Sequence, residues 1–174
     1  PQDATALPVY SVLVALYREA EIVPQLMKAL DRLVWPRDRL EIKLVCEADD
    51  RATIDAIKAL NPASFFEIVE VPPSLPRTKP KALRYAMALT AGEFVVLYDA
   101  EDRPHPGQLL EAHARFVEAD DRLACLQAPL FVSNAGQSLL ARMFAFEYAG
   151  LFRAVLPFLA ATKRILPLGG TSNH

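Results

Sequence analysis

The sequence has too few cysteines for a fold that is stabilised by disulfides. Only two occur in the 174 residues, Cys46 and Cys125, and each lies inside an apolar run. Thiols in such surroundings are typical of small buried side chains in a reducing compartment. A disulfide scaffold is therefore excluded.

The sequence also lacks an excess of charge of either sign. Its formal net charge is −2 at pH 7, and 52% of its residues are hydrophobic. Proteins that wrap nucleic acid carry a clear basic excess, so no nucleic-acid partner is expected. The length and composition predict one globular domain with a hydrophobic core.

Three common catalytic motifs are missing. There is no Walker lysine motif, no G-x-G-x-x-G after the first apolar run and no G-x-S-x-G. These absences argue against P-loop hydrolysis, ordinary dinucleotide chemistry and an α/β-hydrolase. The three histidines show no zinc-ligand spacing, and His113 is predicted to lie on a helix surface.

Apolar runs alternate with helical patterns along the whole chain. The pattern predicts strands at 9–16, 41–46, 65–71, 93–98 and 122–128, and helices at 22–34, 51–60, 81–91, 106–119 and 137–160. This order is typical of an α/β fold in which a mostly parallel sheet carries helices on both faces. Ligands of such sheets bind beyond the carboxyl ends of the strands.

Polar clusters follow three of the expected strands, at residues 17–19, 47–50 and 99–102. In the last cluster Asp99, Glu101 and Asp102 repel one another unless a cation lies among them. Mg²⁺ or Mn²⁺ takes one or two carboxylates together with substrate phosphates, which suits this turn. The alternative is a solvated turn in which Asp102 or a neighbour caps the helix after Pro106.

The other two strand ends and one loop also carry candidate groups. Asp50 is expected to be the N-cap of the next helix, with Thr53 at its third position. Glu47 lies closer to the strand end, where a carboxylate can accept a hydrogen bond from the imide N–H of a uracil. A loop with Arg77, Lys79 and Lys81 precedes a helix, which suits phosphate, although a basic loop can also be merely solvated.

Four segments together resemble the family 2 glycosyltransferases, in the membrane-associated branch that includes cellulose synthase-like enzymes. They are SVLVALYREAE, LVCEADDRAT, RTKPKALRYAMALTAGEFVVLYDAEDRPHPGQL and LPLGGTSNH. The third is the most specific, because it joins a lysine-rich loop, an A-L-x-x-A helix, an apolar strand and D-A-x-D-x-P. The resemblance implies a GT-A fold that binds a UDP-sugar, expected to be glucose-like, and a divalent cation for polysaccharide biosynthesis.

The resemblance also assigns roles to individual residues. Glu47 stands where the family usually has Asp, and Glu101 replaces the second Asp of its D-x-D motif. The implied donor-binding residues are Leu16, Tyr17, Glu19, Glu47, Lys79, Lys81 and Asp99. The implied ligands of Mg²⁺ or Mn²⁺ are Asp99, Glu101 and Asp102, and the residues expected near the saccharide acceptor are Gly170, Thr171 and Ser172.

The family's catalytic base and its Q-x-x-R-W motif lie downstream of the G-G-T-S-N-like segment. No catalytic residue is therefore expected in this sequence, which is interpreted as a fragment that is inactive alone. Residues 1–136 are expected to form the donor-binding part, and residues 137–174 an amphipathic helix with the start of the acceptor side.

Residues 139–161 are very apolar but contain Arg142, Glu147 and Arg153. These charges argue against a helix that spans a membrane alone. The segment resembles the helix that such enzymes lay along the cytoplasmic membrane face, which implies a cytoplasmic domain of a membrane protein.

Two other functions compete with the glycosyltransferase reading. The first is a non-catalytic module that docks on a membrane or a partner through residues 139–161. The second is a nucleotidyltransferase, which would need a glycine-rich loop after the first strand. No such loop lies between Leu16 and Glu21.

Overall fold

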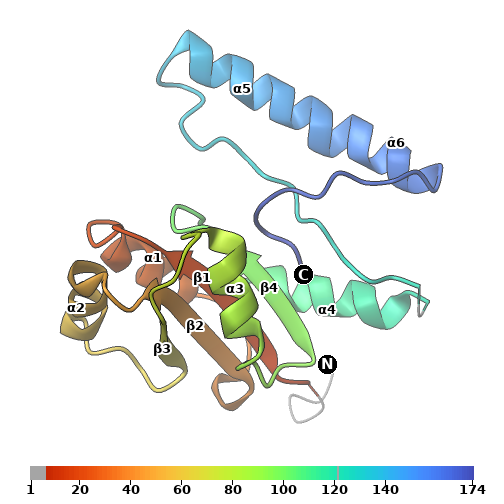
Figure 1. The fold of residues 1–174 in the computed structure, drawn as a ribbon. Coiled ribbons are helices and arrows are strands. Elements are labelled where there is room, and N and C mark those ends of the chain that lie inside the picture. The colour runs from red at the N-terminus through yellow and green to blue at the C-terminus, as the bar shows by residue number, and fades with distance from the viewer. Residues whose placement is uncertain (1–6, 121) are drawn as a thin grey trace. The chain divides into compact units, whose positions relative to one another are not determined.

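The computed structural model describes residues 7–120 and 122–174, which form two compact units (Figure 1). One unit contains the chain up to Leu126 together with His174, and the other is Gln127–Asn173. These units are defined by compactness. The expected division of function at residues 136 and 137 stays a prediction.

The first unit is built on a sheet of four parallel strands. They are β1 (Tyr10–Leu16), β2 (Leu40–Glu47), β3 (Phe66–Val71) and β4 (Phe94–Tyr98). Their order is β3-β2-β1-β4, so β4 lies on the opposite side of β1 from β2. This reversal of strand order opens a crevice at the carboxyl ends of β1 and β4, where ligands of α/β proteins bind.

Helices cover both faces of this sheet, which confirms the predicted α/β fold class. On one face, apolar residues of α1 (Val23–Leu30), α2 (Arg51–Ala59) and α4 (Gln108–Glu118) share a core with Val12, Ile42 and Val96. On the other face, α3 (Lys79–Met87) packs Ala82 and Ala86 against Leu13, Val45 and Val69. Figure 1 shows α3 lying across the strands. Alternate residues of each strand face opposite helices, as the pleat requires.

The expected fifth strand at 122–128 is wrong. The segment makes only an isolated antiparallel bridge, between Gln127 and Asn173, and Leu126 exchanges two backbone hydrogen bonds with His174 at 2.9 and 3.0 Å. An apolar run becomes a strand only where a neighbouring strand can pair with it, and here the neighbour is a short irregular segment. Cys125 is consequently half-buried, whereas Cys46 is fully buried in β2 as predicted.

His113 is buried, so its predicted place on a helix surface is wrong. It shares a face of α4 with Leu109, four residues earlier, and that face packs on the sheet. Its ring meets Trp35 and Phe94 edge to face, with ring centroids 5.6 and 5.4 Å apart. The polar character of histidine hid an aromatic core contact from the sequence pattern.

Burial of His174 should make the stability of the first unit depend on pH. Its Nδ1 lies 2.7 Å from the Tyr10 hydroxyl, and burial lowers its pKa from 6.5 to about 4. Between pH 4 and pH 6.5 the unfolded chain therefore binds a proton at His174, whereas the folded chain does not. The free energy of unfolding is thus undiminished by this group above pH 6.5 and falls as the pH is lowered towards 4. We expect urea titrations at pH 7 and pH 4 to show a loss of about 3 kcal/mol from this group.

The matched variant is His174→Gln, which has no proton to gain. Its free energy of unfolding should fall less than that of the wild type between the two pH values. An equal fall in both proteins would contradict the assignment.

The second unit contains one continuous helical segment. It consists of α5 (Leu139–Gly150), a π-helical turn η3 (Leu151–Val155) and α6 (Leu156–Ala161). The Ser138 side chain caps α5 by accepting a hydrogen bond from the Ala141 N–H at 3.0 Å. Large apolar side chains of this segment, such as Phe146 and Phe158, are exposed.

By length and composition, the helical segment Leu139–Ala161 is the one candidate membrane span in the described part of the chain. Length and composition are weak evidence for a span, so the expectation that this segment does not span a membrane alone stays a prediction. Core helices of soluble proteins can have the same length and composition, but they are mostly buried, whereas this segment is exposed.

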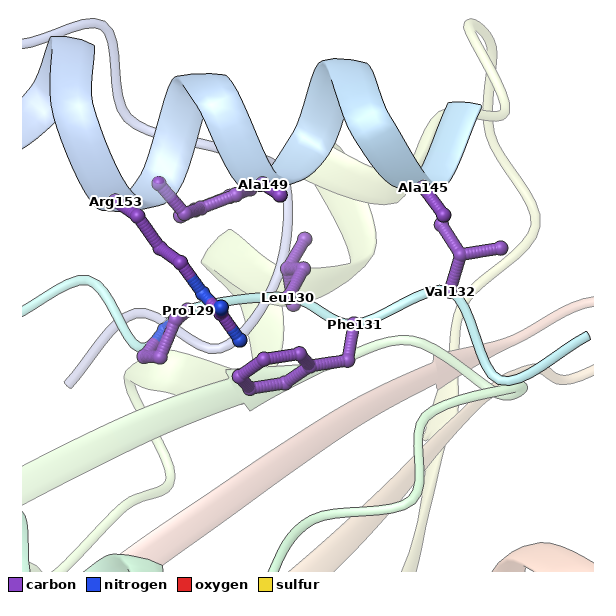
Figure 2. A pocket seen from close by; sticks show the side chains of 8 residues that line it. Pro129, Leu130, Phe131, Val132, Ala145, Ala149 and Arg153 are labelled. Atoms are coloured by element: carbon purple, nitrogen blue, oxygen red, sulfur yellow. The ribbon is translucent and has the colours of Figure 1, made fainter. Parts of the chain in front are cut away.

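A hollow of about 160 Å³ lies beside this helix. Figure 2 shows Arg153 reaching from the helix towards Phe131, with Pro129, Leu130 and Val132 along the facing segment. The Arg153 guanidinium lies 5.4 Å from the centroid of the Phe131 ring, a cation–π contact. Apart from Arg153, the residues that line the hollow are apolar, so the hollow lacks the convergent polar groups of a substrate site.

Candidate donor site

An open cleft of about 310 Å³ lies at the carboxyl ends of β1, β2 and β4 in the first unit. It brings together residues from four segments that are far apart in the sequence. The lining residues are Ala15, Leu16, Tyr17 and Glu19 at the end of β1 and just after it, Glu47 at the end of β2, Arg77, Thr78, Lys79 and Ala82 around the start of α3, and Asp99–Glu101 after β4. The topology predicts a ligand site at this place.

Six of the seven residues expected to bind the donor line this cleft: Leu16, Tyr17, Glu19, Glu47, Lys79 and Asp99. The seventh, Lys81, reaches the wall through Glu47, because its Nζ lies 2.8 Å from Glu47 Oε1. Their proximity is a finding of the structure, whereas their individual roles stay predictions.

The chain turns sharply after β1 at Arg18, whose φ of 58° lies in the left-handed region. A residue with a side chain adopts this conformation at a cost of about 1 kcal/mol or more, so other contacts must hold it. Asp50 provides one, since its Oδ2 accepts a hydrogen bond from the Arg18 N–H at 2.6 Å. Thr53 Oγ1 provides another by accepting from the Glu19 N–H at 3.1 Å.

The N-cap prediction for Asp50 is confirmed, because its side chain accepts a hydrogen bond from the Thr53 N–H. The sequence pattern did not reveal that Asp50 and Thr53 also hold the β1 loop. These two residues therefore position Tyr17 and Glu19 at the cleft without lining it. Capping chemistry was the only signal of their importance.

Each basic side chain at positions 77, 79 and 81 pairs with an acid at the end of a strand or just after it. Arg77 Nη2 lies 2.5 Å from Asp49 Oδ2, and Lys79 Nζ bonds to Asp99 Oδ1. Lys81 pairs with Glu47, whose side chain is only 6% exposed, and also donates to the Ser74 carbonyl at 3.0 Å. These three side chains are thus ion-paired, and the binding of phosphate by this loop stays a prediction.

The turn after β4 is held by its own backbone and by Asp102. Asp102 Oδ2 accepts a hydrogen bond from the Asp99 N–H at 2.7 Å, and the Asp102 N–H donates to the Asp99 carbonyl at 3.1 Å. The N-cap of α4 is Gly107, which has no side-chain cap, so the alternative in which Asp102 caps this helix is wrong. Asp102 does not line the cleft, and its place among the metal ligands stays a prediction.

Acidic groups concentrate on one side of the cleft. The pKa of Glu19 is raised, first by burial and then by the charges of Glu101, Asp99 and Asp50, although a hydrogen bond from the Tyr17 N–H opposes this. Burial is the main cause, and a cation bound beside Asp99 and Glu101 would relieve the smaller part that is due to their charges.

The donor set suits a hard divalent cation. Asp99 and Glu101 both line the cleft, and the Lys79 ammonium already places a positive charge against Asp99. In residues 7–120 and 122–174, no three His, Cys, Asp or Glu side chains are grouped closely enough to hold a metal by themselves. A cation here would therefore also need oxygens from a substrate, as Mg²⁺ and Mn²⁺ sites often do.

The residues expected near the acceptor, Gly170, Thr171 and Ser172, lie in the second unit. Within that unit the Gln127 side-chain amide donates to the Thr171 carbonyl at 3.0 Å, and the Ala128 N–H donates to the Ser172 carbonyl at 2.9 Å. These contacts order the segment, and its role towards an acceptor stays a prediction.

The chain belongs to the family described as "Glycosyltransferase like family 2", whose pattern matches residues 8–172. The α/β sheet is that of a GT-A glycosyltransferase, and the resemblance drawn from the sequence is confirmed. Residues 8–172 include every segment that forms the cleft.

Two relatives are similar over most of the chain. The "Probable glycosyltransferase YdaM" of Bacillus subtilis is 27% identical over 148 residues, which are 84% of this chain and 35% of YdaM. "Glucomannan 4-beta-mannosyltransferase 7" of Arabidopsis thaliana is 25% identical over 147 residues, 80% of this chain and 26% of that protein. The chain thus spans about a third or less of the length of these curated relatives.

Solved structures share the fold. The mannosyltransferase PcManGT of Pyrobaculum calidifontis, in complex with GDP-Man and Mn²⁺, superposes with a TM-score of 0.59 at 27% identity, covering 73% of this chain and 38% of PcManGT. Glucosyl-3-phosphoglycerate synthase of Mycobacterium tuberculosis, in complex with Mn²⁺, UDP and glucosyl-3-phosphoglycerate, gives a TM-score of 0.59 at 18% identity. That likeness covers 98% of this chain and 57% of the synthase.

Proposed function

We propose that this chain binds the donor of an inverting, metal-dependent glycosyltransferase that transfers a sugar from a UDP-sugar to a saccharide acceptor. The observation that carries the proposal is the cleft at the β1–β4 reversal, which combines the carboxylates of Asp99 and Glu101 with Lys79 at a helix N-terminus. Both are needed to hold a nucleoside diphosphate with a cation. Family membership and the Mn²⁺ complex of PcManGT support the same reading.

Lys79 and the start of α3 would hold the diphosphate. Lys79 is the first residue of α3, and Pro80 follows it, so the helix N-terminus opens at the cleft with its dipole favouring negative charge. Asp99 and Glu101 would hold the cation. When bound, Mg²⁺ or Mn²⁺ would offset the charge that builds on the departing nucleoside diphosphate.

Glu47 supports uracil rather than guanine as the base. One of its carboxylate oxygens, Oε1, is engaged by Lys81, and the other, Oε2, is buried without a hydrogen-bond partner in the described part of the chain. Uracil offers a single imide N–H on this edge, whereas guanine offers two N–H groups that pair best with both oxygens of a carboxylate. Because Lys81 already engages Oε1, the remaining oxygen, Oε2, suits a single N–H best, which favours UDP, although PcManGT was solved with GDP-Man.

The acceptor hydroxyl would attack the anomeric carbon from the face opposite the diphosphate and invert that carbon. A carboxylate base takes its proton, and none of the residues in the cleft is assigned this role. We therefore expect this chain to bind UDP-glucose but not to release UDP from it in the presence of an acceptor. The choice of glucose and of a polysaccharide product rests on the family resemblance.

The test is the affinity of the chain for UDP, measured by calorimetry with and without Mn²⁺. The proposal predicts saturable binding of one UDP that is at least about ten times tighter with Mn²⁺, since Asp99 and Glu101 would hold the cation and its charge would attract the diphosphate. Failure to bind UDP at millimolar concentration in the presence of Mn²⁺ would contradict the proposal.

We further propose that the helix Leu139–Ala161 lies on the cytoplasmic face of a membrane. Its exposed apolar side chains favour such a contact. The alternative function, a non-catalytic module that docks on a membrane or a partner, would use the same surface. Phe146→Glu should reduce co-sedimentation with phospholipid vesicles several-fold, while Glu111→Gln on α4 should not. Equal sedimentation of both variants and the wild type would contradict the membrane assignment.

A further inference from the structure

The Lys79–Asp99 ion pair lies where the proposed ligands must bind. Both side chains line the cleft, and both are 31% exposed, so solvent and ligands can reach them. In the proposed function Asp99 holds the cation while Lys79 holds the diphosphate. Each member of the pair is therefore also the partner of a ligand.

We infer that Lys79 and Asp99 form an exchangeable pair that couples cation binding to diphosphate binding. The inference rests on the proposed function and adds a mechanism of regulation to the same site. A cation that binds Asp99 alone displaces Lys79 from the carboxylate and leaves two positive charges side by side. A diphosphate that binds alone draws Lys79 away and leaves the Asp99 carboxylate facing phosphate oxygens.

When both ligands bind, each charge of the original pair gains an opposite partner. Asp99 contacts the cation, Lys79 contacts a phosphate, and the cation contacts the diphosphate. The pair therefore weakens the binding of each ligand alone but not the binding of the two together. The cation and the diphosphate thus bind with positive cooperativity. Coupling of this kind is reciprocal, so UDP and Mn²⁺ must strengthen each other by the same factor.

The neighbouring ion pairs provide a local comparison. Arg77 lines the same cleft, but its partner Asp49 does not, and Asp49 is not a proposed ligand of the cation. Removing the Arg77 charge changes the electrostatic potential of the cleft but leaves the Lys79–Asp99 pair in place. A lysine that only attracts phosphate would act on Mn²⁺ no more than Arg77 does.

The experiment titrates the protein with Mn²⁺ and follows free Mn²⁺ by electron paramagnetic resonance, with and without UDP. The proteins are the wild type, Lys79→Met and the charge-matched control Arg77→Met, with Lys79→Gln as a second variant if Lys79→Met does not fold. Thermal unfolding without ligands establishes that each protein is folded.

We expect Lys79→Met to bind Mn²⁺ alone about ten times more tightly than the wild type does, because Asp99 no longer has a lysine to release. Arg77→Met should change this affinity less than about threefold, because Arg77 is partly exposed and pairs with Asp49 rather than with Asp99. The factor by which UDP strengthens Mn²⁺ binding should fall at least about tenfold in Lys79→Met and remain in Arg77→Met.

Equal affinities of Lys79→Met and Arg77→Met for Mn²⁺ alone would overturn the inference, including the case in which neither binds measurably. The proposed function would survive that result provided that the wild type still bound UDP with Mn²⁺. Failure of the wild type to bind the two ligands together would instead overturn the proposed function itself.

Discussion

Asp99→Asn should abolish the cation-dependent part of UDP binding. Asn keeps the size of the side chain but removes the charge that attracts a divalent cation, and the cation is what links the protein to the diphosphate. We expect the affinity for UDP with Mn²⁺ to fall at least about 100-fold, or about 2.8 kcal/mol, in calorimetric titrations. The affinity for UDP without Mn²⁺ should change far less.

The matched control is Glu111→Gln, which also converts a surface acid into its amide. Glu111 pairs with Arg115 one turn along α4 and does not line the cleft, so UDP binding should be unchanged. The assignment of Asp99 would fail if Asp99→Asn, with an unfolding temperature close to that of the wild type, still bound UDP more tightly in the presence of Mn²⁺.

Glu47→Gln should weaken UDP binding and reduce the preference for UDP over GDP. A charged acceptor strengthens a hydrogen bond to about 1.5–3 kcal/mol, so its loss corresponds to about 10- to 100-fold in affinity. The wild type should bind UDP at least about ten times more tightly than GDP, because Lys81 occupies one oxygen of Glu47. In the variant this ratio should approach one.

Asp49→Asn is the control for Glu47→Gln, since Asp49 lies two residues along the chain and pairs with Arg77 at the exposed rim. An exposed pair contributes about 0–1 kcal/mol, so UDP affinity should fall less than about fivefold. Tighter binding of GDP than of UDP by the wild type would contradict the assignment of the base.

The strands of the sheet were predictable because short apolar runs that are rich in β-branched residues and end in polar residues are compatible with few structures other than a buried strand. The four parallel strands begin and end within two residues of the expected positions. The fifth failed because pairing depends on a neighbouring segment, which an apolar pattern does not reveal. The helix that begins at Val23 ends at Leu30, earlier than its pattern predicts, although Leu33 beyond it is still buried.

The location of the candidate site was predictable from topology, since strand ends of a parallel sheet meet at one edge. The ion pairs inside the cleft were not, because the partners are far apart in the sequence. The rest of α3 and β4 lie between Lys79 and Asp99, and α2 and β3 lie between Glu47 and Lys81. Which lysine meets which acid depends on how α3 lies on the sheet. The same limit concealed the link from Asp50 to Arg18.

The most direct test of the donor site is a crystal structure of the chain with UDP and Mn²⁺, in which anomalous scattering locates the metal. The account predicts a manganese peak bound by Asp99 and by diphosphate oxygens, with the uracil ring beside Glu47. A peak away from Asp99, or a nucleotide bound outside the cleft, would contradict it.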